Sequence, residues 1–292
     1  MQLVFELLLF GLTLGGLYAM VAMGLTLQYG VARIMNLAYG ELLIGAAFAT
    51  YAAFTALQLS PLLALALAFP LGFALNWLVY RLLLLPLVRR TQAGPALEVD
   101  SLLATFGLLF VVQGVMLVLF GGGYHSYSYA AEAVVLFGSR IAENRLIMFT
   151  FTAVVGSALY LFLTRTRAGS AVRAVATAPN HAALVGIDVG SVSAFTFAAG
   201  GSLVAAGGVL ASMFLTFSAS MGVIFTMKAL IVVIMGGVGN VVGCVIAGLL
   251  LGLSETLVAR LIDPGLTLAV NYVLFLAVLL WRPAGLFGRP AR

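Results

Sequence analysis

The side chains that could do chemistry in this chain are few and scattered. Its two histidines, His125 and His181, fall in segments expected on opposite membrane faces, and its single cysteine, Cys244, lies in the apolar run VVGCVIAGLL. A metal site needs several such ligands at one point, so this set predicts none. Asp188 and Asp263 fall at opposite span ends, which argues against an aspartyl pair.

Motifs that would mark an enzyme do not occur in the sequence. It holds no G-x-S-x-G of a serine hydrolase and no G-x-x-x-x-G-K-[ST] phosphate-binding loop, and its sole lysine, Lys228, follows Met227. The residues therefore favour a transporter or channel over an enzyme. If transport is driven by ATP, another subunit must bind the nucleotide.

The elements that position these residues are membrane-spanning helices. The 292-residue chain is 63% hydrophobic and 8% charged, with a mean hydropathy of +1.19, whereas about a quarter of the residues of a soluble domain are charged. Its 33 glycines suit close helix packing in lipid. We expect an all-α, polytopic transmembrane bundle of eight to nine spans with a short cytoplasmic helix pair, forming a single domain over residues 1–292.

The predicted spans are stretches long enough to cross about 30 Å of hydrocarbon. They cover about 5–29, 36–57, 61–85, 101–120, 146–164, 191–217, 223–259 and 265–281. The segment 223–259 is too long for one crossing and is interrupted at Gly236–Gly243. It predicts either two helices that meet at a turn or one span plus a re-entrant element.

The formal charge of +5 indicates orientation rather than nucleic-acid binding, because the basic residues lie beside hydrophobic spans. Most of them fall on one side if the spans alternate: Arg33, Arg81, Arg89, Arg90, Arg165, Arg167, Arg173, Arg282, Arg289 and Arg292. The positive-inside rule makes this side cytoplasmic. The amino terminus is then outside, the carboxyl terminus is cytoplasmic, and the number of crossings is odd.

Residues 165–191, RTRAGSAVRAVATAPNHAALVGIDVGS, form a basic, alanine-rich interlude on the cytoplasmic side. The spacing of Ala168, Ala171, Val172 and Val175 predicts the apolar stripe of a helix. We expect Pro179 to end it. The interlude is either an interfacial helix in the lipid headgroups or a docking element for another protein.

A second short helix is predicted within the same interlude. Asn180 is expected to cap it and Gly186 to end it, while Asp188 and Ser191 cap the span that follows. Its small side chains would allow close insertion into a groove of a partner.

The sequence resembles the membrane subunits of ATP-binding-cassette importers of the branched-chain amino acid type, specifically the H-type permease. The resemblance runs over nearly the full length. It rests on GLTLGGLYAMVAMGLTLQYG (11–30), IMNLAYGELLIGA (34–46), RAVATAPNHAALVGIDV (173–189), KALIVVIMGGVGNVVGCVIAGLLLGLSE (228–255) and WRPAGLFG (281–288).

This resemblance implies partners and a location. The coupling segment, about residues 165–190, would dock to an ATPase subunit through Arg173, Ala174, Ala178, Ala182, Ala183 and Gly186. The partners would be a second, related M-type permease, two ATPase subunits that bind ATP and Mg, and an extracytoplasmic solute-binding protein. The location would be a bacterial cytoplasmic (inner) membrane, and no cofactor is expected in this chain.

Two stretches are candidates for the translocation path. In NLAYGELLIG, Asn36, Tyr39, Gly40 and Glu41 combine polar groups, with Glu41 expected about two turns inside the second span, where an unpartnered carboxylate is costly. Asn36 is expected to share a helical face with Tyr39 or Gly40. The alternative is a buried polar group that ties helices together.

The second stretch is glycine-rich. Its candidates are Gly236, Gly237, Gly239 and Asn240, because unwound backbone at membrane depth is tolerated where it lines a cavity. The alternative there is a tight turn between antiparallel helices. Lys228 and Glu255 are expected near the outer ends of their spans, extending toward the interface.

The mechanism expected from the resemblance is alternating access driven by ATP in the partner subunits. Branched-chain amino acids are the expected solutes, and urea and short amides are alternatives. The alternative function is a solitary passive channel or a secondary transporter. A secondary transporter would need ion-coupling carboxylates in its spans, for which Glu41 is the candidate.

Overall fold

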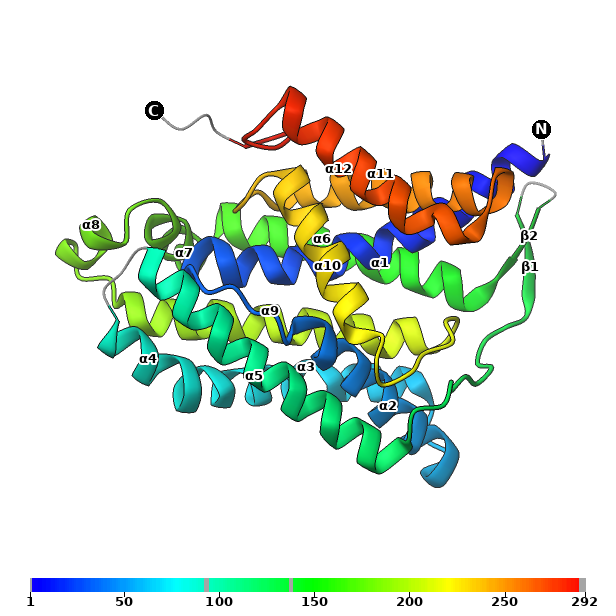
Figure 1. The fold of residues 1–292 in the computed structure, drawn as a ribbon, viewed down its shortest axis with the longest axis horizontal. Helices are drawn as coiled ribbons and strands as arrows, with labels where there is room; N and C mark the ends of the chain where they lie inside the picture. The colour runs from blue at the N-terminus through cyan, green and yellow to red at the C-terminus, as the bar shows by residue number, and fades with distance from the viewer. Residues whose placement is uncertain (1, 92–94, 137–138, 289–292) are drawn as a thin grey trace.

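A computed structural model describes residues 2–91, 95–136 and 139–288, and nearly all of them are helical (Figure 1). The first half contains α1 (Gln2–Ala32), α2 (Tyr39–Leu57), α3 (Pro61–Val79), the π-helical turn Tyr80–Leu84, α4 (Leu85–Arg90), α5 (Pro95–Phe120), β1 (Ala133–Leu136) and β2 (Ser139–Ala142). The second half contains α6 (Glu143–Arg165), α7 (Arg167–Thr177), α8 (Pro179–Leu184), α9 (Val189–Ser212), α10 (Gly222–Gly236), α11 (Val241–Leu261), the 3₁₀ turn Pro264–Leu266 and α12 (Thr267–Trp281).

Eight helical segments of the described residues are long and apolar enough to cross a membrane, which confirms the predicted polytopic bundle. Two of them combine consecutive elements: Pro61–Arg90 runs from α3 through α4, and Pro264–Trp281 joins the 3₁₀ turn to α12. The helix α10 is apolar but has only 15 residues, or about 22 Å at 1.5 Å per residue. Figure 1 shows α1 beginning at the end of the long axis opposite to α8.

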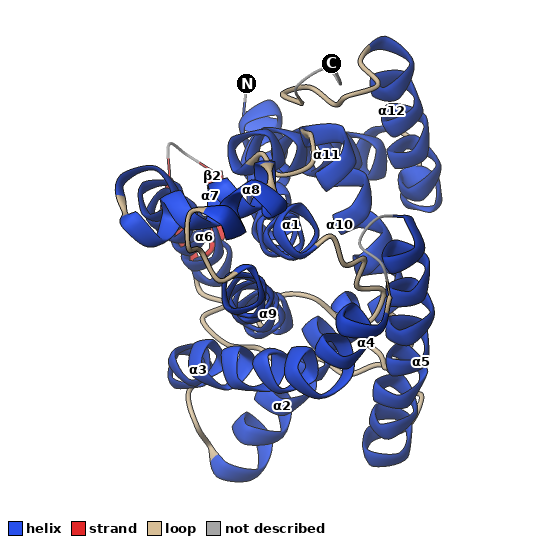
Figure 2. Ribbon diagram, turned by 90° about the vertical axis from the view of Figure 1, so that its left-hand side faces the viewer, coloured by secondary structure: helices blue, strands red, loops and turns tan. Residues whose placement is uncertain are grey.

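The helices α1 and α9 form the centre of the bundle (Figure 2) and are mostly buried, whereas few residues of α5, α6 and α12 are buried. Helix α1 packs so closely on α11 that a methyl group on Gly252 would overlap the backbone of Gly15. In lipid the hydrophobic effect does not drive helices together, so transmembrane helices associate through close contacts between small residues. Gly15 of α1 and Gly252 of α11 therefore mark a close crossing of the two helices.

The loop before α6 contains a short antiparallel hairpin, β1–β2, that the sequence analysis did not predict. The loop is tied down by a backbone bridge in which His125 N donates to Phe217 O at 2.8 Å and Phe217 N donates to His125 O at 3.0 Å. The His125 ring packs against Phe48 and Tyr51, with ring centroids 5.2 Å apart in each case. His125 therefore serves to hold this loop on α2.

The basic segments gather at one end of the bundle. Figure 1 places α4, α7 and α8 there, and the amino terminus and the hairpin at the other end. His181 lies on α8, whereas His125 lies in the loop between α5 and β1. Arg289 and Arg292, assigned to the basic side, lie outside the described residues.

Candidate functional site

The surface helices α7 and α8 form the predicted pair within the coupling segment. Helix α7 begins at the cap Thr166, whose hydroxyl accepts from Gly169 N at 2.9 Å. Val172 and Val175 are buried as predicted, whereas Ala168 is exposed. Gly169 lies on the buried face of α7 and packs directly on the end of α6, where a methyl group on Gly169 would overlap the Phe162 carbonyl. The buried face of α7 therefore includes Gly169 in place of Ala168.

The connection between the two helices differs from the prediction at one residue. Ala178 is the residue before α8, Pro179 is its first residue, and Asn180 lies inside the helix rather than capping it. Proline suits the first helical position because its missing N–H has no intrahelical partner there. Gly186 ends the pair with a φ of 81°, as expected for a left-handed terminating residue.

Asp188 caps α9, as predicted. Its Oδ1 accepts from Gly190 N at 3.0 Å and from Ser191 N at 3.3 Å, and its Oδ2 accepts from the Ser191 hydroxyl at 2.5 Å. The hydrogen bonds from the Ser191 hydroxyl and backbone favour the charged form and lower the pKa of this exposed carboxyl. The coupling segment is therefore held at both ends by capping residues.

The coupling-segment candidates divide by exposure. Arg173, Ala183 and Gly186 are exposed, and Ala174 and Ala178 are half-buried. Ala182 is instead buried in a small cluster that joins α8 to α1 and α7 through Val31, Val172 and Val175. Its role within the chain is to fix α8 in place, so its side chain does not face outward.

Two exposed apolar residues in this segment were not among the predicted docking residues. Leu184 and Val185 are 83% and 75% exposed, at the tip formed by the end of α8 and the residue after it. Both stand in the HAALV run, but only the structure shows that Ala182, and not these larger residues, faces the core. The tip presents an apolar surface beside Ala183 and Gly186.

The first path candidate lies at an interruption in the helices rather than inside a span. Residues 33–38 are not helical, so Asn36 precedes α2 and does not share a helical face with Tyr39 or Gly40. The backbone of this segment is hydrogen-bonded to α5 through Thr105. The Thr105 hydroxyl donates to Met35 O at 2.9 Å and accepts from Leu37 N at 3.1 Å. Non-helical backbone is thereby satisfied by side chains.

Asn36 and Tyr39 fasten the start of α2 to the central helices. Asn36 Nδ2 donates to Gln28 Oε1 at 3.0 Å, and Gln28 Nε2 donates to Phe197 O at 2.9 Å. The Tyr39 hydroxyl lies 2.9 Å from Val21 O and 3.1 Å from Gly200 O. These contacts join α1, α2 and α9.

Gly40 and Glu41 lie where α2 crosses α10. Gly40 N donates to the Thr226 hydroxyl at 2.8 Å, and a methyl group on Gly40 would overlap the Gly222 carbonyl. Glu41 lies in the first turn of α2, not two turns inside it, because the helix begins only at Tyr39. Its carboxylate is fully buried against Gly222, and neither oxygen accepts a hydrogen bond from the described residues.

The glycine-rich stretch forms a tight turn between α10 and α11. Gly237 and Gly239 adopt φ angles of 99° and 81°, and Asn240 caps α11 by accepting from Gly243 N at 3.0 Å. Asn240 Nδ2 also donates to Phe287 O at 3.1 Å. Gly236, buried at the end of α10, packs against Gly243. These contacts are those of a tight turn between two helices, which was the alternative to a lining of the translocation path.

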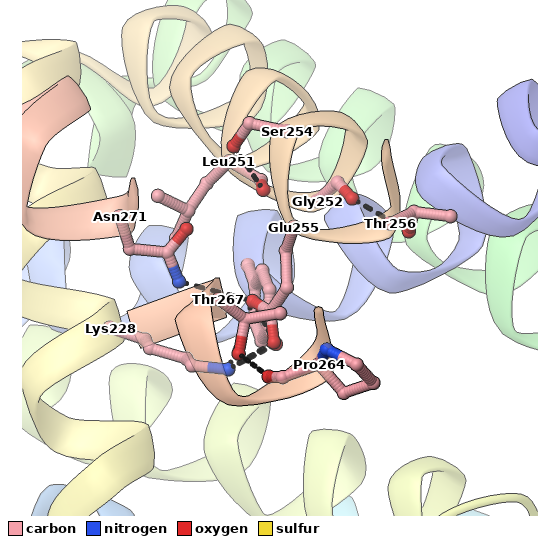
Figure 3. Close-up of polar contacts among 10 residues, drawn as sticks. Lys228, Leu251, Gly252, Ser254, Glu255, Thr256, Pro264, Thr267 and Asn271 are labelled. Carbon is pink, nitrogen blue, oxygen red and sulfur yellow. Dashed lines mark hydrogen bonds and ion pairs between the residues drawn. The ribbon is translucent and has the colours of Figure 1, made fainter. Parts of the chain in front are cut away.

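Lys228 and Glu255 do not extend toward the interface as expected; they form a buried ion pair that joins α10 to α11. Lys228 Nζ lies 2.7 Å from Glu255 Oε1 and donates to the Tyr18 hydroxyl at 2.7 Å. Glu255 Oε2 accepts from the Tyr18 hydroxyl at 2.9 Å and from Asn271 Nδ2 at 3.2 Å. Figure 3 shows Lys228 and Asn271 converging on Glu255. The only indication of this ion pair in the sequence is the presence of a lysine and a glutamate in apolar helices.

Cys244 is buried and packs where α11 meets α1, with its sulfur 2.8 Å from the Thr26 hydroxyl. The contact gives Cys244 a role in the packing of these two helices. Among the described residues, no group of three histidine, cysteine, aspartate or glutamate side chains is arranged to hold a metal ion.

Comparisons with known proteins agree on one family. The model of the family described as "Branched-chain amino acid transport system / permease component" matches residues 7–280. The chain is 29% identical to the high-affinity branched-chain amino acid transport system permease protein BraD of Pseudomonas aeruginosa and 28% identical to LivH of Escherichia coli K12; both alignments cover 96% of this chain and 94% of the relative. It is 27% identical to a probable LivH of Methanocaldococcus jannaschii, over 93% of this chain and 89% of that protein. No solved structure gives a significant match.

Proposed function

The chain belongs to the family of permease components of branched-chain amino acid transport systems, and on this premise we propose that it forms half of the translocation path of an ATP-binding-cassette importer. It is a multi-pass membrane protein and a transport component rather than an enzyme. In the proposed assembly it pairs with a related M-type permease. Two ATPase subunits bind ATP and Mg, and an extracytoplasmic binding protein delivers the solute.

The observation that carries the proposal is the surface built by α7 and α8. Its inner face is fixed by Val172, Val175 and Ala182, while Leu184 and Val185 project from its tip. An apolar tip on a rigidly held helix pair is suited to a groove in a partner protein, because its burial there removes apolar surface from water. A helix pair that is fixed in this way supports docking of an ATPase subunit better than a loop without such packing would.

The proposed orientation follows from charge. Arg89, Arg90, Arg165, Arg167 and Arg173 lie on or beside α4 and α7, at the end of the bundle that also carries the coupling segment. By the positive-inside rule this end faces the cytoplasm. The amino terminus and the hairpin β1–β2 then face outward, in a bacterial cytoplasmic membrane.

The proposed mechanism is alternating access. Closure of the two ATPase subunits moves the docked helix pair, and the movement changes which side of the permease pair is open. The proposed solutes are branched-chain amino acids, because the named relatives are permeases for them. Urea and short amides are the alternative solutes.

The experiment is reconstitution of the chain with an ATPase, a second permease and a binding protein of the same family of transport systems. We expect uptake of labelled leucine into proteoliposomes that requires ATP and the binding protein. An ATPase variant unable to hydrolyse ATP is the control. Leucine uptake by this chain alone, independent of ATP, would instead establish the solitary channel or secondary transporter.

A further inference from the structure

A cavity of about 550 Å³ lies between α1, α6 and α11, at the end of the bundle that carries the amino terminus. Its walls are mainly apolar, with leucine and phenylalanine side chains from α1 and from the segment after α9. Four charged residues also line it: Glu6, Arg145, Glu255 and Arg260. An apolar pocket with a few charged groups is the usual form of a small-molecule site.

Two of these charges are already accounted for. Glu255 is neutralised by Lys228 and accepts hydrogen bonds from Tyr18 and Asn271. Arg260 is exposed to solvent, which weakens its electrostatic influence. The charges that remain for a ligand are therefore Glu6 and Arg145.

Glu6 and Arg145 line the same cavity with opposite charges, yet no ion pair joins them or links either to another described residue. The Arg145 guanidinium is held over the Phe10 ring, 4.3 Å from its centroid, and lies 5.9 Å from the centroid of Phe214. Stacking on aromatic rings fixes the plane of the guanidinium while leaving its N–H donors free for a ligand.

We propose that this cavity binds a hydrophobic α-amino acid as its zwitterion, with the carboxylate on Arg145 and the ammonium on Glu6. The aliphatic side chain lies against Phe10, Leu14 and Leu215. A planar guanidinium pairs with a carboxylate through two parallel hydrogen bonds, whereas a carboxylate such as Glu6 accepts from an ammonium. The inference rests on the proposed function, and it adds a site within the permease itself, on the face proposed to receive solute.

A zwitterionic lipid headgroup carries the same pair of charges. It differs from leucine in carrying a phosphate and two acyl chains, and it would remain with the protein through purification. The test therefore separates the two sources by adding the amino acid to protein in lipid of stated composition and by analysing the lipid that co-purifies.

The experiment measures binding of labelled L-leucine to the full chain in phosphatidylglycerol nanodiscs, because this lipid carries no ammonium group. Unlabelled isopentylamine, which lacks the carboxylate, and 4-methylpentanoate, which lacks the ammonium, serve as competitors. We expect each to compete about tenfold or more weakly than leucine, since each loses one charge-assisted hydrogen-bonding group.

Substitutions then assign each charge to its residue. In Arg145→Gln the preference for leucine over isopentylamine should disappear, and in Glu6→Gln the preference over 4-methylpentanoate should disappear. Arg90→Gln, at the opposite end of the bundle, is the matched control and should keep both preferences. Because the two cavity variants change different preferences, a general loss of folding cannot produce the expected pattern.

Three results would overturn the proposal: no leucine binding by the wild-type chain, preferences unchanged in both cavity variants, or a co-purified zwitterionic lipid that is lost in Arg145→Gln while leucine does not bind. ATP-dependent leucine uptake by the reconstituted importer is measured separately. Uptake that persists at the wild-type rate in Arg145→Gln would leave the proposed function standing and reject this site.

Discussion

The ammonium of Lys228 lies 2.7 Å from the carboxylate of Glu255, and this ion pair joins α10 to α11 inside the bundle. Only 11% and 13% of the two side chains are exposed, so each charge depends on the other for compensation. The pair also positions Glu255 at the wall of the cavity between α1 and α6. It gives the short helix α10 a polar anchor.

Removal of one partner of this pair should destabilise the protein. Lys228→Met leaves Glu255 buried without a counter-charge, at a cost of about 3–5 kcal/mol in unfolding free energy. The double variant Lys228→Met/Glu255→Gln should recover most of the loss. Unfolding in mixed micelles, analysed as a double-mutant cycle, measures the coupling, and strictly additive effects would contradict it.

The apolar tip of the coupling segment should control ATPase binding. Leu184→Asp places a charge on the exposed tip and should abolish co-purification of the ATPase without lowering the yield of the chain. Tyr124→Asp, on an exposed residue of the loop that carries the hairpin, is the matched control. Retained ATPase binding by Leu184→Asp would count against docking at this tip.

Gly186 tests the same contact through its backbone. Gly186→Arg combines bulk with an unfavourable left-handed conformation, whereas Gly186→Asn tolerates that conformation. We expect the arginine variant to lose ATPase binding and the asparagine variant to fold normally and keep most of it. Loss in both variants with normal folding would show that any side chain is excluded there, and binding by both would reject the contact.

The crossing of α2 and α10 should not tolerate a larger residue. Gly40→Ala forces a methyl group into the Gly222 carbonyl, and we expect about 1–3 kcal/mol of destabilisation from overpacking. Gly107→Ala, on α5, meets no other atom and should gain up to about 1 kcal/mol from helix propensity. Thermal unfolding of both variants makes the comparison, and equal effects would reject a close crossing.

Glu41 should matter for transport more than for assembly. Glu41→Gln keeps the shape of a side chain that is fully buried and accepts no hydrogen bond from the described residues, but it removes the group that can ionise. We expect ATP-dependent uptake to fall several-fold while the amount of assembled complex stays the same. Unaltered uptake by the variant would contradict this prediction.

The sequence by itself determined the class of fold, the placement of most spans and the helix pair of the coupling segment. Span length is set by the thickness of the hydrocarbon, and caps such as Asp188 act through neighbours only two or three residues away. Such local rules can be applied to a sequence without knowledge of its tertiary contacts. The family resemblance was recognisable for the same reason, since its motifs are contiguous.

The tertiary structure decided which residues meet. Lys228 and Glu255 are 27 positions apart, and only the pairing of α10 with α11 turns them from two isolated charges into one buried ion pair. The delayed start of α2 at Tyr39 depends on α5, because Thr105 satisfies the backbone that a helix would otherwise satisfy itself. Ala182 faces inward and Leu184 outward because α8 rests on α1 and α7. Burial and pairing of this kind arise from contacts distant in sequence, so periodicity within one segment does not reveal them.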